Sequence, residues 1–149
     1  MIQPDYQQNM KHALELRESG NEMQFMPRDA FWAPITAKRL LDLQERGGAD
    51  DFFSSDFSDE ELVERLGHIG RLPNLELLVV FSGSDEYIPK HVDALSLSQR
   101  IVAAMNTHSC VAKSLYLPTA NHNISGGEGD MHRFLDGVST LLRDAAPNP

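Results

Sequence analysis

The sequence has a single cysteine, Cys110, and no uninterrupted apolar run longer than the five residues at 77–81. A lone cysteine cannot form an internal disulfide, and a helix needs about 20 apolar residues to cross a bilayer. Residues 1–30 also lack the basic segment followed by an apolar stretch that marks a secretion signal. We therefore expect a soluble, cytoplasmic protein that has no membrane partner.

Positive charge is scarce as well. The chain carries 13 Lys and Arg against 22 Asp and Glu, which gives a net charge of -9. Such an acidic chain has no general attraction for nucleic acid or for anionic membrane surfaces. The six histidines are scattered without the spacing of zinc ligands. The sequence therefore predicts neither a nucleic-acid partner nor a metal site.

The first seventy residues are expected to be mostly helical. Apolar side chains recur at helical spacing in 5–18 and 36–46, and Thr36 is placed to cap the second of these helices. A third helix should begin after Ser58, because Glu61 follows it at the spacing of a capping box. No part of this region shows a convincing strand pattern.

The second half of the chain alternates strands with helices. Nearly continuous apolar strands at 75–81 and 111–117 are each followed by a helical pattern, at 91–106 and at 131–142. This order predicts the α/β class, with parallel strands joined by a crossover helix. Two parallel strands alone leave unpaired edges and apolar area, so the segment should pair with another chain or belong to a larger fold.

Chemically useful side chains follow both strands. Asp85 and Glu86 come after the first strand, and His122 comes after the second. An acid followed by a histidine makes up two thirds of a Ser-His-acid triad, in the chain order of α/β-hydrolases. The alternative is structural: Asp85 would cap a turn, and His122 would be a surface histidine bonded to nearby backbone. A shift of one residue in the loop would exchange Asp85 for Glu86.

Two further motifs are better explained structurally. The acidic run 50–56 could bind a cation, but it lacks the Gly and Glu positions of an EF-hand, which favours a solvated loop. The Gly-rich segment 125–129 has no Lys and Ser/Thr of a phosphate-binding loop and does not match G-x-G-x-x-G. Cys110, at a strand entrance, is expected to fill the core rather than to act as a nucleophile.

Three strings together resemble one family, the fungal α/β-hydrolases that include siderophore-esterase-like enzymes. They are the D-D-F-F-S-S-D string at 50–56, the S-G-S-D-E-Y-I-P string at 82–89 and the A-N-H-N string at 120–123. The similarity covers about residues 10–143 but matches only the C-terminal portion of that family. It implies a serine hydrolase of carboxylic esters, siderophore-type esters among them, that uses no dissociable cofactor.

The resemblance also assigns roles to residues. Asp85 matches the triad acid and His122 the triad base, while residues near 20–60 match a cap or lid. We accordingly divide the chain into a helical and lid segment, 1–70, and a βαβα part of one incomplete hydrolase domain, 71–149.

The family's nucleophile is the main departure, because no G-x-S-x-G pentapeptide or preceding oxyanion-hole loop occurs in the chain. The chain alone is therefore expected to be inactive, as a truncated gene product, a fragment or a subunit completed by another polypeptide. The alternative is a hydrolase remnant without catalysis that serves as a protein-interaction domain. It would form a homo- or hetero-oligomer through an exposed sheet edge.

Overall fold

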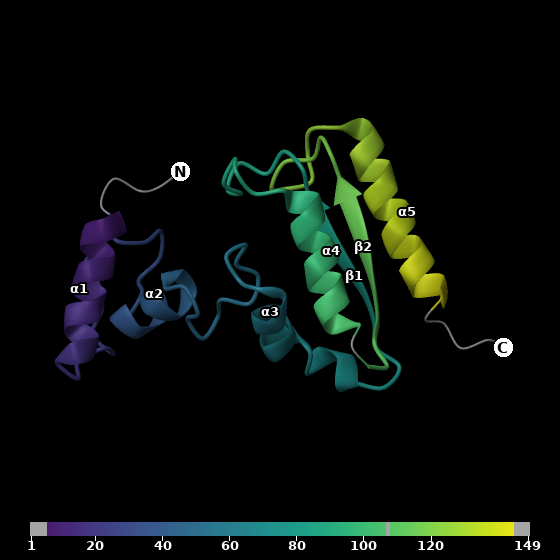
Figure 1. The fold of residues 1–149 in the computed structure, drawn as a ribbon. Coiled ribbons are helices and arrows are strands. Elements are labelled where there is room, and N and C mark those ends of the chain that lie inside the picture. The colour runs from purple at the N-terminus through teal and green to yellow at the C-terminus, as the bar shows by residue number, and fades with distance from the viewer. Residues whose placement is uncertain (1–5, 107, 145–149) are drawn as a thin grey trace. The chain divides into compact units, whose positions relative to one another are not determined.

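The computed structural model describes residues 6–106 and 108–144. The chain forms two compact units, with the boundary between Ser54 and Ser55 (Figure 1). The predicted division at residue 70 is of another kind, because it separates a lid segment from a hydrolase segment according to their expected functions. That division stays a prediction, since the grouping of contacts does not test it.

The first unit is built from two helices and the irregular chain between them. Helix α1 spans Tyr6–Glu18, and Gly20 follows it in the left-handed conformation, with φ of 74°. Helix α2 spans Ala37–Gln44, and the side chain of Thr36 caps it by accepting a hydrogen bond from the Arg39 N–H, as predicted. The core consists of seven buried apolar residues: Ala13, Met26, Ala30, Ile35, Ala37, Leu40 and Leu41.

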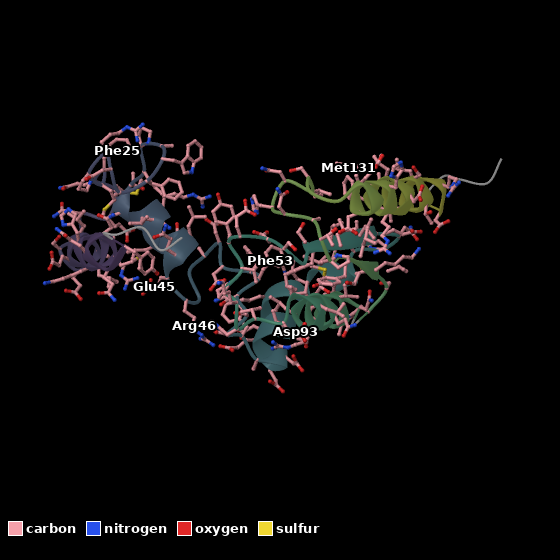
Figure 2. The ribbon with its side chains drawn as sticks, turned by 90° about the horizontal axis from the view of Figure 1, so that it is seen from above. Phe25, Glu45, Arg46, Phe53, Asp93 and Met131 are labelled. Atoms are coloured by element: carbon pink, nitrogen blue, oxygen red, sulfur yellow. The ribbon has the colours of Figure 1, made fainter. Side chains whose placement is uncertain are left out.

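The exposed side of this unit carries aromatic rings and one well-formed ion pair. Trp32 is 81% exposed and Phe25 is 70% exposed. Arg17 donates two hydrogen bonds to the carboxylate of Glu45, which is labelled in Figure 2, at 2.6 and 3.2 Å. This carboxylate raises the pKa of the Arg17 guanidinium, through hydrogen bonding first and charge second. The pair connects α1 to the end of α2.

The second unit contains the only sheet among the described residues. Strands β1 (Glu76–Ser82) and β2 (Val111–Leu117) are parallel, with Glu76 opposite Val111 and Ser82 opposite Leu117. Helix α4 (Ala94–Met105) connects the strands, and α5 (Glu128–Asp144) follows β2. The predicted strand–helix–strand–helix order and the parallel pairing are confirmed.

Helix α3 (Asp59–Leu66) and a short 3-10 helix, η1 (Ile69–Arg71), precede the sheet. The predicted capping box is present, because Ser58 Oγ accepts from the Glu61 N–H and Glu61 accepts from the Ser58 N–H. Helix α4 begins later than the sequence predicted, since the carboxylate of Asp93 caps it by accepting from the Ser96 N–H at 3.0 Å (Figure 2).

The sheet lies between two helical layers, α4 on one face and α5 on the other (Figures 1 and 2). On the α4 face, the hydroxyls of Ser98 and Ser114 are hydrogen-bonded at 2.9 Å. On the α5 face, Gly137 lets the helix approach the side chains of Leu78 and Leu115 closely. The large apolar side chains that are fully buried in this unit come from α3, α4 and β2: Leu62, Leu66, Ile101 and Leu117.

Helix α5 buries only part of its apolar stripe. Met131, Leu135 and Leu142 are 38%, 52% and 66% exposed, although they lie at helical spacing with the residues that face the sheet. Apolar side chains that line up on one face usually meet a partner. Among the described residues, none of the helices is both long and apolar enough to cross a membrane.

Candidate active site

Two loops meet at the edge of the sheet where both strands end. Three hydrogen bonds join Gly83 and Ser84, just after β1, to the end of β2 and the loop that follows it. Gly83 N–H donates to Leu117 O at 2.7 Å, Ser84 N–H donates to Ala120 O at 3.0 Å, and Ser84 Oγ donates to Pro118 O at 3.2 Å. Because parallel strands place their carboxyl ends at the same edge, residues 34 or more apart in the chain become neighbours here.

Gly83 makes this close approach possible. A Cβ atom at this position would lie 2.8 Å from Pro118 O and would also collide with the Tyr116 hydroxyl. Both contacts of such a Cβ atom, with Pro118 O and with the Tyr116 hydroxyl, would be closer than normal van der Waals contact, so a side chain would force the two loops apart. The absence of a side chain at residue 83 therefore determines how near the acid and the histidine can come.

The predicted acid and base lie in direct contact. His122 Nδ1 is 3.0 Å from Asp85 Oδ2. The other carboxylate oxygen, Asp85 Oδ1, accepts the Tyr87 N–H at 2.9 Å, which fixes the orientation of the carboxylate. The Asp85 side chain is 15% exposed and the His122 side chain 55% exposed. The acid is thus held inside the loop while the imidazole remains accessible.

Glu86 contacts the same histidine at a different atom. Its Oε2 accepts the backbone N–H of His122 at 3.2 Å. Of the two acids that the sequence left open, Asp85 bonds to the ring of His122 and Glu86 to its main chain. The ring of Tyr87 meets the imidazole edge-on, with centroids 4.8 Å apart and an interplanar angle of 74°.

The loop that carries His122 is also held from within. Asn121 Oδ1 accepts hydrogen bonds from the N–H groups of Asn123 and Ser125, at 3.1 and 2.9 Å. Ile124 adopts a left-handed conformation, with φ of 57°. The amide of Asn121 therefore stabilises a tight turn just after the histidine, which keeps the main chain of His122 in place.

Asp130, in the first turn of α5, anchors the other end of this loop. It is 4% exposed and accepts two hydrogen bonds at 2.7 Å from Thr119, one from N–H and one from Oγ–H. The Thr119 hydroxyl bond is the main reason that the pKa of Asp130 is lowered, and Arg133 adds a smaller effect in the same direction. No role was predicted for Asp130, although an acid in the first turn of a helix is a recognisable signal.

The acidic run 50–56 and Cys110, for which the sequence favoured a structural role, both make contacts of that kind. Asp51 in the acidic run accepts the Gly47 N–H at 2.9 Å, and Asp50 is paired with Arg39. Cys110 is buried, at 5% exposed. Within residues 6–106 and 108–144, no cluster of three or more His, Cys, Asp or Glu side chains could hold a metal ion.

The parallel strands, the helices on both faces and the loops at the strand ends are those of part of an α/β-hydrolase fold, the class of protein that the match to a solved siderophore hydrolase shows. More particularly, the chain belongs to the family described as "Protein of unknown function (DUF1749)", which matches residues 3–143. The recognition made from the sequence is confirmed, because the relatives with described activities are fungal esterases.

Three relatives illustrate this family resemblance. The chain is 35% identical over 106 residues to Fusarinine C esterase sidJ of Aspergillus fumigatus, covering 64% of this chain and 30% of that protein. It is 33% identical over 105 residues to Esterase AN6793 of Emericella nidulans, covering 62% of this chain and 28% of that protein. A solved structure, Siderophore hydrolase EstB from Aspergillus fumigatus, matches with a TM-score of 0.68 and 28% identity.

The chain spans less than a third of the curated relatives it matches. It covers 49% of the EstB chain, while 94% of its own residues are matched. The fold of this chain is therefore that of one portion of an α/β-hydrolase.

Proposed function

We propose that this chain provides the acid and the histidine of a serine-type carboxylic-ester hydrolase. Asp85 is the triad acid and His122 the triad base. The nucleophilic serine comes from a G-x-S-x-G segment that the printed sequence does not contain. The observation that carries the proposal is the 3.0 Å contact between His122 Nδ1 and Asp85 Oδ2, across loops that follow neighbouring parallel strands.

The chemistry follows from this contact. With its proton on Nδ1, the imidazole donates to Asp85 and leaves Nε2 free to accept the proton of the serine hydroxyl. The serine oxygen attacks the acyl carbon of the ester, and the imidazolium then gives the proton to the departing alkoxide. In the second half, His122 takes a proton from water as the water oxygen attacks the acyl carbon, and the imidazolium then returns that proton to the departing serine oxygen as the acid is released. Asp85 stabilises the imidazolium in both halves.

The substrate class in this proposal is a carboxylic ester of the siderophore type. Support comes from the names of the relatives, a fusarinine C esterase and a siderophore hydrolase. The segment near residues 20–60 corresponds in this proposal to the lid of the family, and no dissociable cofactor is required. A cytoplasmic location forms part of the same proposal and fits the single cysteine of the sequence.

A second candidate function is protein interaction without catalysis. The two-stranded sheet and the exposed Met131, Leu135 and Leu142 of α5 favour it, since together they provide strand edges and an apolar stripe for a partner. In this alternative the chain forms a homo- or hetero-oligomer. A stable oligomer in sizing chromatography, together with no detectable hydrolysis of any ester, would support it.

The experiment compares two proteins. One is the 149-residue chain, and the other is the product of the longest transcript that contains its reading frame. We expect the longer product to contain G-x-S-x-G, to react with a fluorophosphonate at that serine and to hydrolyse an activated ester. The chain alone should do neither.

Matched variants make the test specific. In the longer product, His122→Ala and Asp85→Asn should each lower kcat by about 10⁴-fold or more. His132→Ala is the control, because His132 is an exposed histidine on α5 whose Nδ1 is hydrogen-bonded to the Glu128 carbonyl of the same helix, at 2.8 Å. Full activity in His122→Ala would rule the proposal out.

A further inference from the structure

The segment 84–87 does more than provide an acid. Each of its four residues makes a contact with the loop that follows β2. Ser84 bonds to backbone carbonyls on that loop, Asp85 to the imidazole, and Glu86 to the main chain of His122, while Tyr87 packs its ring on the imidazole. Three consecutive residues, 85–87, thus contact the main chain or the side chain of one histidine, and Ser84 holds the loop just before it.

We infer that Glu86 and Tyr87 are positioning residues for His122. This inference rests on the proposed function, in which His122 Nε2 must point at a serine. An imidazole that is held only through Nδ1 retains two motions. Its side chain can rotate about the Cα–Cβ bond, and its loop can move and carry the ring with it. Glu86 fixes the Cα end by accepting the backbone N–H at 3.2 Å, and Tyr87 blocks rotation of the ring.

The exposure of these side chains supports a role other than folding. Glu86 is exposed and Tyr87 is 65% exposed, so neither contributes to the core. A large aromatic ring left in solvent gains little from burial, but it gains from an edge-to-face contact with another ring. The Glu86 bond has an ionised acceptor, and such bonds are stronger than neutral ones.

Charge gives a second consequence. The reaction turns His122 into a cation, and two carboxylates, Asp85 and Glu86, are bonded to this one residue. Asp85 is at hydrogen-bond distance from the imidazole itself and Glu86 from the backbone N–H of the same residue, and opposite charges attract even near the protein surface. Glu86 therefore stabilises the same ionic state as Asp85, from the main-chain side of the histidine.

The test uses the 149-residue chain itself and needs no nucleophile. Nitrogen-15 NMR of the imidazole reports which ring nitrogen carries the proton. Ring-current shifts of the His122 carbon-bound protons report the Tyr87 contact. In the unsubstituted chain, at a pH where the His122 imidazole is neutral, we expect one dominant tautomer, protonated at Nδ1. We also expect the carbon-bound protons of the His122 ring to be shifted by the Tyr87 ring.

The variants separate the two contacts. Glu86→Ala should lower the population of the Nδ1-protonated tautomer severalfold, whereas Glu86→Gln, which retains an oxygen acceptor, should restore it. Tyr87→Leu should abolish the ring-current shift and also lower the population of that tautomer, whereas Tyr87→Phe should retain both. Glu64→Ala is the matched control, because Glu64 is an exposed acid on α3 and its loss changes the net charge equally.

The outcomes distinguish the two proposals. If the unsubstituted chain itself lacks the Nδ1-protonated tautomer, the Asp85–His122 pairing behind the proposed function is refuted. If that tautomer is present but is unchanged in both Glu86→Ala and Tyr87→Leu, the positioning role is refuted and the proposed function stands. If Glu64→Ala has the same effect as Glu86→Ala, the effect is one of net charge, and the positioning role of Glu86 is again refuted.

Discussion

Gly83→Ala is the substitution that tests the site geometry most directly. The new Cβ would lie 2.8 Å from Pro118 O and would collide with the Tyr116 hydroxyl. The carbonyl belongs to the backbone, so the contact cannot be relieved by turning a flexible side chain. Forcing one extra carbon into such a contact typically costs about 1–3 kcal/mol.

Gly129→Ala supplies the reference for this magnitude. Nothing lies within 4 Å of a Cβ built at Gly129, which is exposed in the first turn of α5. Both substitutions reduce the freedom of the unfolded chain, which stabilises a protein by about 0.4–1 kcal/mol where no strain opposes it. The difference between the two variants therefore isolates the contact cost, and we expect Gly83→Ala to be less stable by about 1–3 kcal/mol.

Urea unfolding followed by amide signals of β1 and β2 measures this difference. The single tryptophan, Trp32, is in the other unit, so its fluorescence does not report on the sheet. Gly83→Ala should also weaken the Asp85–His122 contact, seen as a loss of the Nδ1-protonated tautomer of His122. Equal stability of the two variants, with His122 unaffected, would show that the loops are not packed through Gly83.

Two further predictions concern stability. The pKa of Asp130 is lowered in the folded state, so its contribution is present above the unfolded value of about 3.9 and is lost as pH falls through the folded pKa. Asp130→Asn should therefore flatten the acid limb of a stability–pH curve for the second unit, whereas Asp136→Asn on the same helix should leave that limb steep, and an unchanged limb in Asp130→Asn would contradict the assignment. Ile101→Ala, at a fully buried position in α4, should lower the free energy of unfolding by about 2–5 kcal/mol, measured by urea titration. Leu95→Ala, 41% exposed on the same helix, should cost far less, and equal costs would refute the assigned core.

Several local features could be predicted from the sequence because they depend on neighbours in the chain. The Thr36 cap and the capping box at Ser58 involve residues three positions apart, and both are present. The two strands were placed to within one residue, since continuous apolar runs bounded by turn residues are typical of buried parallel strands. Helix starts were less certain: Asp93 caps α4 later than the apolar spacing indicated.

The printed sequence by itself determined the helices, the strands and the presence of an acid and a histidine after successive strands. Only the tertiary structure decided that Asp85 meets the imidazole while Glu86 meets the backbone of His122. A shift of one residue in a loop exchanges the two acids, and nothing local fixes that shift. It is fixed by the parallel pairing of β1 and β2 and by the close approach at Gly83, both of which join residues more than 30 positions apart.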